Sequence, residues 1–186
     1  GSSQAVVVSA NRAYVADALN GLRVIDTSDP TLPVERGALD TGGYAFGVGL
    51  YGSHVFVADG ASGLRIINVS NPAAPYETGH ADTPGAAYGV AVTSQYAYVA
   101  DGSAGLRAIN VVDRAHPYET GSVDTPGTAR NVCVLGARAY VADSSAGLRV
   151  VSLANPAAPV EIGMRGVSGS AYDVVVSGDY AYIAAA

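Results

Sequence analysis

Short apolar runs alternate with short polar connections along the whole chain. In residues 86–127 the segments YGVAVTSQ, YAYVADG, GLRAINVV and YETGSVDT follow one another, rich in Val, Ile, Ala and Tyr. These residue types favour strands, and the apolar positions lack the spacing of an amphipathic helix. The pattern predicts four strands of about 5 to 6 residues, joined by connections of about 4 to 6 residues, and therefore an all-β fold.

The same pattern recurs every 42 residues. The tripeptide Gly-Leu-Arg begins at positions 21, 63, 105 and 147, and Pro, Glu and Gly residues keep the same step in all four units. A step of about 40–45 residues is that of a four-stranded propeller blade. Because the strands are apolar on both faces, each blade must be covered on either side, and an arrangement of blades around an axis provides this.

The repeat predicts one β-propeller domain over residues 1–186. Its four-stranded antiparallel blades are expected at about 4–43, 44–85, 86–127 and 128–169, followed by half of a fifth blade at 170–183. Three arrangements are open: a four-bladed ring with an extra hairpin, an open arc of a larger propeller, or an assembly in which chains complete one another. We favour a part of a larger propeller, and we expect self-association by edge pairing because an unpaired strand edge invites it.

The charge balance excludes several classes of partner. The chain has 16 acidic and 10 basic residues, all of the basic ones Arg, and a net charge of -6. Without a basic stripe we expect no nucleic-acid partner, and without an apolar run of about 20 residues we expect no insertion into a membrane. The single cysteine, Cys133, excludes an internal disulfide and is predicted to be a small buried residue.

Two charged columns follow the repeat. One contains Asp17, Asp59, Asp101 and Asp143, and the other contains Arg23, Arg65, Arg107 and Arg149. One carboxylate per blade is too few for a calcium site. We therefore predict a structural role, in which each Asp accepts hydrogen bonds from its own turn or pairs with the Arg six residues later.

The sequence contains no motif that carries catalysis or binds a cofactor. His54, His80 and His116 occupy three different positions of the repeat, so we do not expect them to converge on a metal ion. A nucleophile elbow and a zinc-protease motif are both absent. No catalytic residue, metal ligand or cofactor is assigned.

Departures from the repeat point to a different kind of site. Arg130 stands in the column of Tyr88 and Tyr172, and Asn131 and Asp173 stand in a column that otherwise contains Gly. Both columns lie at the entry of the innermost strand, where successive blades face a common axis. These five residues are therefore predicted to line the mouth of a central pocket, the usual ligand site of a propeller, although drift in a solvated funnel would give the same pattern.

The repeated segments resemble a known family. GLRVIDTSDP, GLRIINVSNPAAP, GLRAINVVDRAHP and GLRVVSLANPAAP, each preceded by YVAD or FVAD, are similar to the LVIVD repeat of bacterial and archaeal surface proteins, over about residues 4–183. The resemblance implies a β-propeller, a location outside the cell or on its surface, and an interaction module without catalytic residues to carry over.

Two functions remain open at this point. The first is a non-enzymatic propeller scaffold that contacts a protein or a glycan, as part of a larger exported or cell-surface protein. The second is a propeller hydrolase or lactonase with a metal or polar cluster in its central channel.

Overall fold

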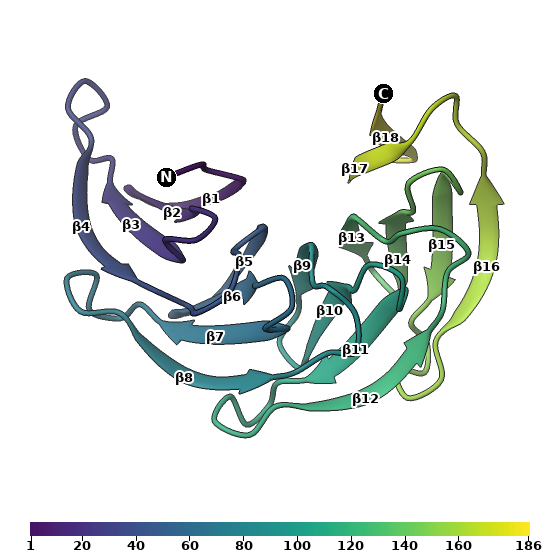
Figure 1. The fold of residues 1–186 in the computed structure, drawn as a ribbon, viewed down its shortest axis with the longest axis horizontal. Helices are drawn as coiled ribbons and strands as arrows, with labels where there is room; N and C mark the ends of the chain where they lie inside the picture. Colours follow the sequence, from purple (N-terminus) through teal and green to yellow (C-terminus); the bar gives the residue numbers. More distant parts are fainter.

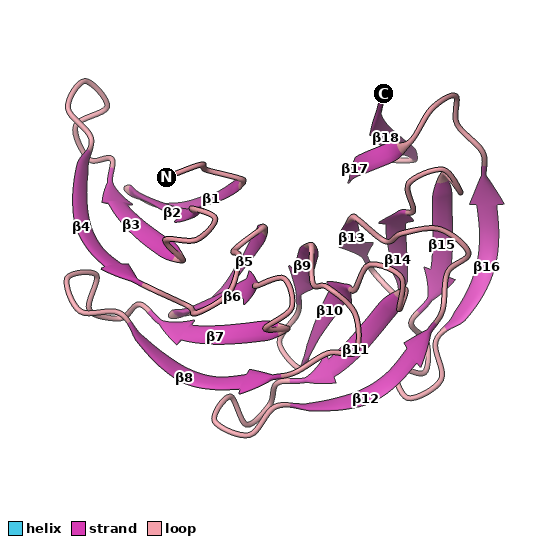
Figure 2. Ribbon diagram, viewed as in Figure 1, coloured by secondary structure: helices cyan, strands magenta, loops and turns pink.

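The computed structural model describes all of residues 1–186, which form 18 strands and no helix (Figure 2). The strands are β1 (Ala5–Ser9), β2 (Arg12–Ala16), β3 (Leu22–Asp26), β4 (Val34–Leu39), β5 (Gly47–Tyr51), β6 (His54–Ala58), β7 (Leu64–Asn68), β8 (Tyr76–Ala81), β9 (Gly89–Val92), β10 (Tyr96–Ala100), β11 (Leu106–Asn110), β12 (Tyr118–Val123), β13 (Asn131–Leu135), β14 (Arg138–Ala142), β15 (Leu148–Ser152), β16 (Val160–Arg165), β17 (Ala171–Ser177) and β18 (Tyr180–Ala185).

Each group of four consecutive strands forms one antiparallel sheet in sequence order, and β17 and β18 form a two-stranded sheet. The predicted all-β fold with four full blades and half of a fifth is confirmed. The blades stand side by side in an open arc, with β1, β5, β9, β13 and β17 on the inner side and β4, β8, β12 and β16 outside (Figure 1). The two ends of the arc stay apart, so the chain does not form a four-bladed ring.

The apolar core lies between the blades. Phe56 and Ile66 of the second blade pack in one cluster with Val90, Val99 and Ile109 of the third, and equivalent clusters fill the other junctions. Phe56, Val99 and Ile109 are fully buried. Because burial of one such side chain stabilises the fold by about 1.5–3 kcal/mol, the junctions between blades are the main source of stability.

The crossover loops carry the chain from the outer strand of one blade to the inner strand of the next. Gly60 and Ala87 form an isolated antiparallel bridge between neighbouring blades, with both backbone hydrogen bonds at 3.0 Å. The same bridge recurs at each of the following two junctions. Inside each blade, the turn between the second and third strands ends at the Gly of Gly-Leu-Arg. In the third blade this residue, Gly105, has a φ of 77°, which is unfavourable for residues with a Cβ.

A glycine in each outer strand lies against the next blade. A Cβ on Gly79 would clash with the carbonyl oxygen of Arg114, and one on Gly121 would come within 2.5 Å of the carbonyl oxygen of Pro156. Gly163 holds the same position in the fourth blade, but a Cβ there would meet nothing closer than Val150 Cβ at 3.9 Å. This glycine is thus required wherever the outer loop of a following blade covers it.

Replacing Gly79 by Ala should destabilise the protein, whereas Gly163→Ala should be tolerated. The added methyl group at position 79 must displace backbone of the third blade, an overpacking cost of about 1–3 kcal/mol, while that at position 163 has free space. Urea unfolding of the two variants and the parent measures the difference. Equal loss of stability in both variants would contradict this account of the glycine.

Candidate functional site

The aspartate column fixes the crossover loops. Asp101 is fully buried; its Oδ1 accepts a hydrogen bond from Thr83 Oγ1 at 2.5 Å, and its Oδ2 accepts one from the Gly85 backbone N–H at 2.9 Å. Thr83 and Gly85 belong to the loop that enters the same blade from the preceding one. The carboxylate thereby ties that loop to the end of the second strand.

The same arrangement occurs around Asp143, where Thr125 Oγ1 donates at 2.7 Å and the Gly127 N–H at 2.9 Å. Asp59 accepts from Thr41 Oγ1 at 2.6 Å. We call this contact of Asp with the Thr of the crossover loop the Thr–Asp clasp. The Thr partner was not predicted from the sequence, although Thr41, Thr83 and Thr125 form a column of the repeat.

The arginine column lies beside the aspartates. Arg107 Nε is 3.8 Å from Asp101 Oδ2, and its Nη1 is 3.6 Å from Glu119. Arg149 is placed similarly, with Nε 3.6 Å from Asp143 Oδ2. A hydrogen bond from the turn itself is present only at Asp17, which accepts from Asn20 Nδ2 at 3.1 Å. In each of the four full blades, the Arg Nε thus lies 3.5–3.9 Å from a carboxylate oxygen of the Asp of the same blade.

Thr83→Val should lower the free energy of unfolding by about 1–3 kcal/mol, because the substitution keeps the shape but leaves the buried carboxylate without its hydroxyl donor. Thr120→Val is the matched control, since the buried Thr120 hydroxyl has no hydrogen-bond partner and its removal should be neutral or stabilising. Chemical denaturation measures both. A similar loss in the two variants would show that the Thr–Asp clasp contributes nothing specific.

The stability provided by Asp101 should depend on pH. Burial raises the pKa of this carboxyl above its usual 3.8, against the opposing hydrogen bonds of Thr83 and Gly85. Because the pKa is higher in the folded state, the contribution is fully present below about pH 3.8 and is lost as the pH rises through the raised value. The difference in melting temperature between the parent and Asp101→Asn should therefore fall from acid to neutral pH.

Asp113→Asn provides a control, because the stability that Asp113 contributes should depend on pH in the opposite direction. Hydrogen bonds from His116 and the Ala115 N–H lower the pKa of Asp113. Its contribution is thus present above about pH 3.8 and is lost as the pH falls through the lowered value. Thermal unfolding between about pH 3 and pH 7 checks both signs; a parent-minus-variant difference that rises with pH at Asp101 would contradict the assignment.

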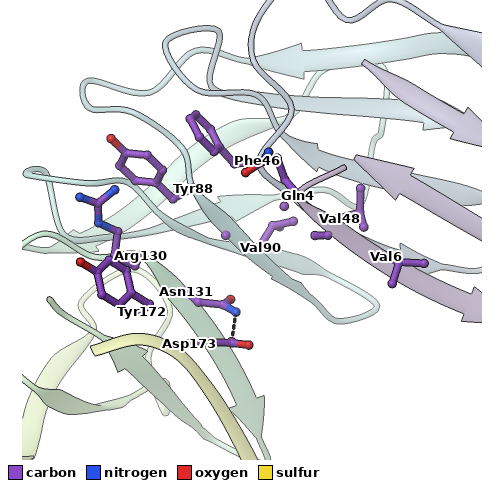
Figure 3. A pocket seen from close by; sticks show the side chains of 13 residues that line it. Gln4, Val6, Phe46, Val48, Tyr88, Val90, Arg130, Asn131, Tyr172 and Asp173 are labelled. Atoms are coloured by element: carbon purple, nitrogen blue, oxygen red, sulfur yellow. Dashed lines mark hydrogen bonds between the residues drawn. The ribbon is translucent and has the colours of Figure 1, made fainter. Parts of the chain in front are cut away.

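A pocket of about 590 Å³ lies on the inner side of the arc, at the entry of the innermost strands. All five inner strands contribute to it (Figure 3). Its lining consists of Gln4, Ala5, Val6, Phe46, Gly47, Val48, Tyr88, Gly89, Val90, Arg130, Asn131, Tyr172 and Asp173. The five residues selected from the sequence all lie here. Gln4 and Phe46, which stand in the same column as Tyr88, were not selected.

A row of side chains in contact runs from Tyr44 to Phe46, Tyr88 and Arg130, and the last three line the pocket. The ring centroids of Tyr44 and Phe46 are 4.4 Å apart, and those of Phe46 and Tyr88 are 4.8 Å apart. The Arg130 guanidinium continues the row at 4.5 Å from the Tyr88 centroid. A cation over an aromatic face is held by about 0.5–2 kcal/mol, so Arg130 replaces an aromatic ring of the repeat and still contacts the ring of the preceding blade.

Ser144 holds the arginine from the other side. Its Oγ accepts a hydrogen bond from Arg130 Nε at 3.3 Å. Ser144 occupies the position of Gly60 and Gly102 and, like them, has a positive φ, 47°, a conformation that is strained for serine. Ser144 was not predicted from the sequence, although the change from Gly to Ser in the repeat marks it.

Asn131 and Asp173 form the polar part of the pocket. Asn131 Nδ2 donates a hydrogen bond to Asp173 Oδ1, which also accepts from the Val174 N–H at 2.8 Å. In Figure 3 this pair lies across the pocket from Val6. Gly89 in the same column lies close to the Asn131 backbone, with 2.8 Å between an added Cβ and Asn131 Cα. In this column, polar side chains occur only at Asn131 and Asp173, in the fourth blade and in β17.

The three histidines and the single cysteine do not come together in one site. His54 Nε2 is 3.3 Å from Asn68, His80 pairs with Glu77 at 2.9 Å and His116 with Asp113 at 2.9 Å. No group of three or more His, Cys, Asp or Glu residues is close enough together to hold a metal ion. Cys133 is half-buried and packs at the edge of the cluster between the fourth blade and β17 and β18.

The antiparallel blades and the pocket at their inner edge define an open β-propeller. The LVIVD repeat family matches residues 1–41, 42–83, 84–125, 126–164 and 168–186, and the chain belongs to this family. No curated protein matches the sequence. No helix has the length and apolar character needed to cross a bilayer.

Two solved structures share the fold at low sequence identity. A functionally unknown protein from Desulfotomaculum acetoxidans DSM 771 is 16% identical with a TM-score of 0.82, over 98% of this chain and 62% of that one. The computationally designed Ika8 protein is 8% identical with a TM-score of 0.79, over 98% of this chain and 55% of that one. The chain thus spans less than two thirds of either similar structure.

Proposed function

We propose that this chain is a non-enzymatic binding module of a larger exported or cell-surface protein, and that the inner pocket holds a neutral glycan. The observation that carries the proposal is the hydrogen-bonded Asn131–Asp173 pair beside the exposed Tyr172 in a pocket of about 590 Å³. The extracellular location is supported by the resemblance to LVIVD surface proteins, and the larger parent by the greater length of the two similar structures.

The chemistry of the lining matches a sugar. A sugar ring combines an apolar C–H face with hydroxyl groups that both donate and accept hydrogen bonds. Tyr172, 51% exposed, offers an aromatic face to the first. The Asp173 carboxylate and the Asn131 amide supply acceptors and donors for the second.

The charges in the pocket favour a neutral ligand. Arg130 and Asp173 both line it, so their opposite charges balance. The guanidinium is moreover already engaged by the Tyr88 ring and by Ser144. An anion would have to compete with Asp173, and a cation with Arg130. A polyhydroxylated molecule needs neither charge to be neutralised.

Restoring the repeat residues in the double variant Asn131→Gly and Asp173→Gly should remove binding. Asn131 and Asp173 occupy the same position of the repeat, which is Gly in the second and third blades. The double variant should therefore keep the strand geometry. A panel of neutral oligosaccharides screened on an array and titrated by calorimetry should bind the parent, and the affinity should fall by about tenfold or more in the variant.

The matched control is Asp113→Asn, which changes a carboxylate in an exposed loop of the third blade outside the pocket and should bind as the parent does. Unchanged affinity in the double variant would place the glycan elsewhere. Failure of every neutral oligosaccharide to bind, or binding of a protein alone through these residues, would overturn the glycan assignment.

A further inference from the structure

A second, smaller pocket lies between the first and the second blade. It has a volume of about 260 Å³ and is lined by Arg12, Asp26, Arg36, Asn71, Pro72 and Ala73. The first three residues belong to β2, β3 and β4, and the last three to the loop between β7 and β8. None of the six lines the inner pocket. We call this site the outer pocket; both of its walls belong to complete blades.

The charged residues of the outer pocket depart from the repeat. At the next two junctions the positions of Arg12, Asp26 and Arg36 hold His54, Asn68 and Thr78, and then Tyr96, Asn110 and Thr120. In the fourth blade Arg138 stands in the column of Arg12, but Ile162 replaces the second arginine. The blades therefore pack without this set of charges, and two arginines beside one aspartate occur only at the first junction.

Arg12 has no carboxylate partner, although Asp26 lies directly opposite it on the neighbouring strand. Asp26 Oδ2 accepts hydrogen bonds from Arg36 Nε at 3.0 Å and Nη2 at 2.9 Å, and Oδ1 accepts one from the Ser28 N–H at 2.9 Å. Hydrogen bonds from Ser28 and then from Arg36 lower the pKa of Asp26 from 3.8 to about 2. The carboxylate is therefore charged at neutral pH and engaged by Arg36, and Arg12 is left without an ion pair.

The outer pocket is electropositive in an acidic protein. Two guanidinium groups and one carboxylate give it a net charge of +1, whereas the whole chain has a net charge of -6. Asn71 adds a neutral donor: its Oδ1 accepts a hydrogen bond from the Ala73 N–H at 3.2 Å, and its Nδ2 has no partner in the protein. A guanidinium group matches the two oxygens of a carboxylate, and one monovalent carboxylate would make the outer pocket neutral.

We propose that the outer pocket binds the carboxylate group of a small molecule. Arg12 is its ion-pair partner, Asn71 Nδ2 is a further donor, and Arg36 contributes positive charge while it holds Asp26. Pro72 and Ala73 contact the carbon skeleton that carries the carboxylate. The site is independent of the glycan proposed for the inner pocket, because the two pockets share no residue.

Arg12→Gln tests the ion pair. In an NMR titration of the ¹⁵N-labelled protein at constant ionic strength, sodium acetate and sodium glucuronate should each shift the backbone N–H signals of Arg12, Asn71 and Ala73 in a saturable way. The affinity should fall by about tenfold or more in Arg12→Gln, because the unpaired cation is lost. Arg138→Gln is the matched control, since it removes an arginine of the same column outside the outer pocket, and should bind as the parent does.

Asp26→Asn should act in the opposite direction and tighten binding by about tenfold, because it removes the competing carboxylate and releases Arg36. The turn should persist, since Asn68 at the same position of the repeat accepts the equivalent hydrogen bond from the Ser70 N–H at 2.9 Å. A purely structural role of Asp26 would not produce a gain in affinity.

Two further probes check the ligand class. Glucose, which lacks the carboxylate of glucuronate, should give no saturable shift of these signals. Absence of saturable shifts with both acetate and glucuronate, unchanged affinity in Arg12→Gln, or weaker binding in Asp26→Asn would each overturn the proposal. A clear preference for sulfate over acetate would overturn the assignment of a carboxylate.

Discussion

Every blade of this protein must be covered on both faces, and the rest of the structure follows from that constraint. The strands carry Val, Ile, Ala and Tyr in all directions, so a sheet on its own would expose as much apolar surface as it buries. Neighbouring blades cover these apolar surfaces, and the two blades at a junction contribute different types of side chain. An aromatic ring such as Phe56 comes from one side, and valines such as Val90 and Val99 come from the other.

Polar contacts then set how the blades are spaced. At each full junction a buried Asp reaches the threonine of the crossover loop, and a glycine of the outer strand lets the next blade approach. The Thr and the Asp disappear together in the last unit, where Val167 and Ala185 take their places. A buried carboxylate without its donor would be unfavourable, so the two residues form one structural unit.

The fold could be predicted well from the sequence because each position of the repeat occurs in several units of the chain. Strand type, blade size and the two-stranded last sheet could all be derived from the 42-residue step and the turn glycines. The openness of the arc could not, since the angle between blades depends on packing at each junction. The Thr partner of Asp101 was also missed, because it lies in a different loop, 18 residues away.

The candidate site was predictable where a residue departs from its column. Arg130, Asn131 and Asp173 were found in this way, and the structure brings them into one pocket with Tyr88 and Tyr172. Ser144 was overlooked because its replacement of Gly is small, and its relation to Arg130 depends on a contact between the turn after β14 and the residue before β13.

The junctions between blades are nearly identical, and this has a consequence for how such a chain can change. A segment of one period can be duplicated or deleted by recombination, at any point, without disturbing a single contact inside the neighbouring units. Chain length can therefore vary in whole steps while the geometry stays constant, and the Asn131–Asp173 pair shows that changes at one repeat position in two neighbouring units are enough to place polar groups side by side.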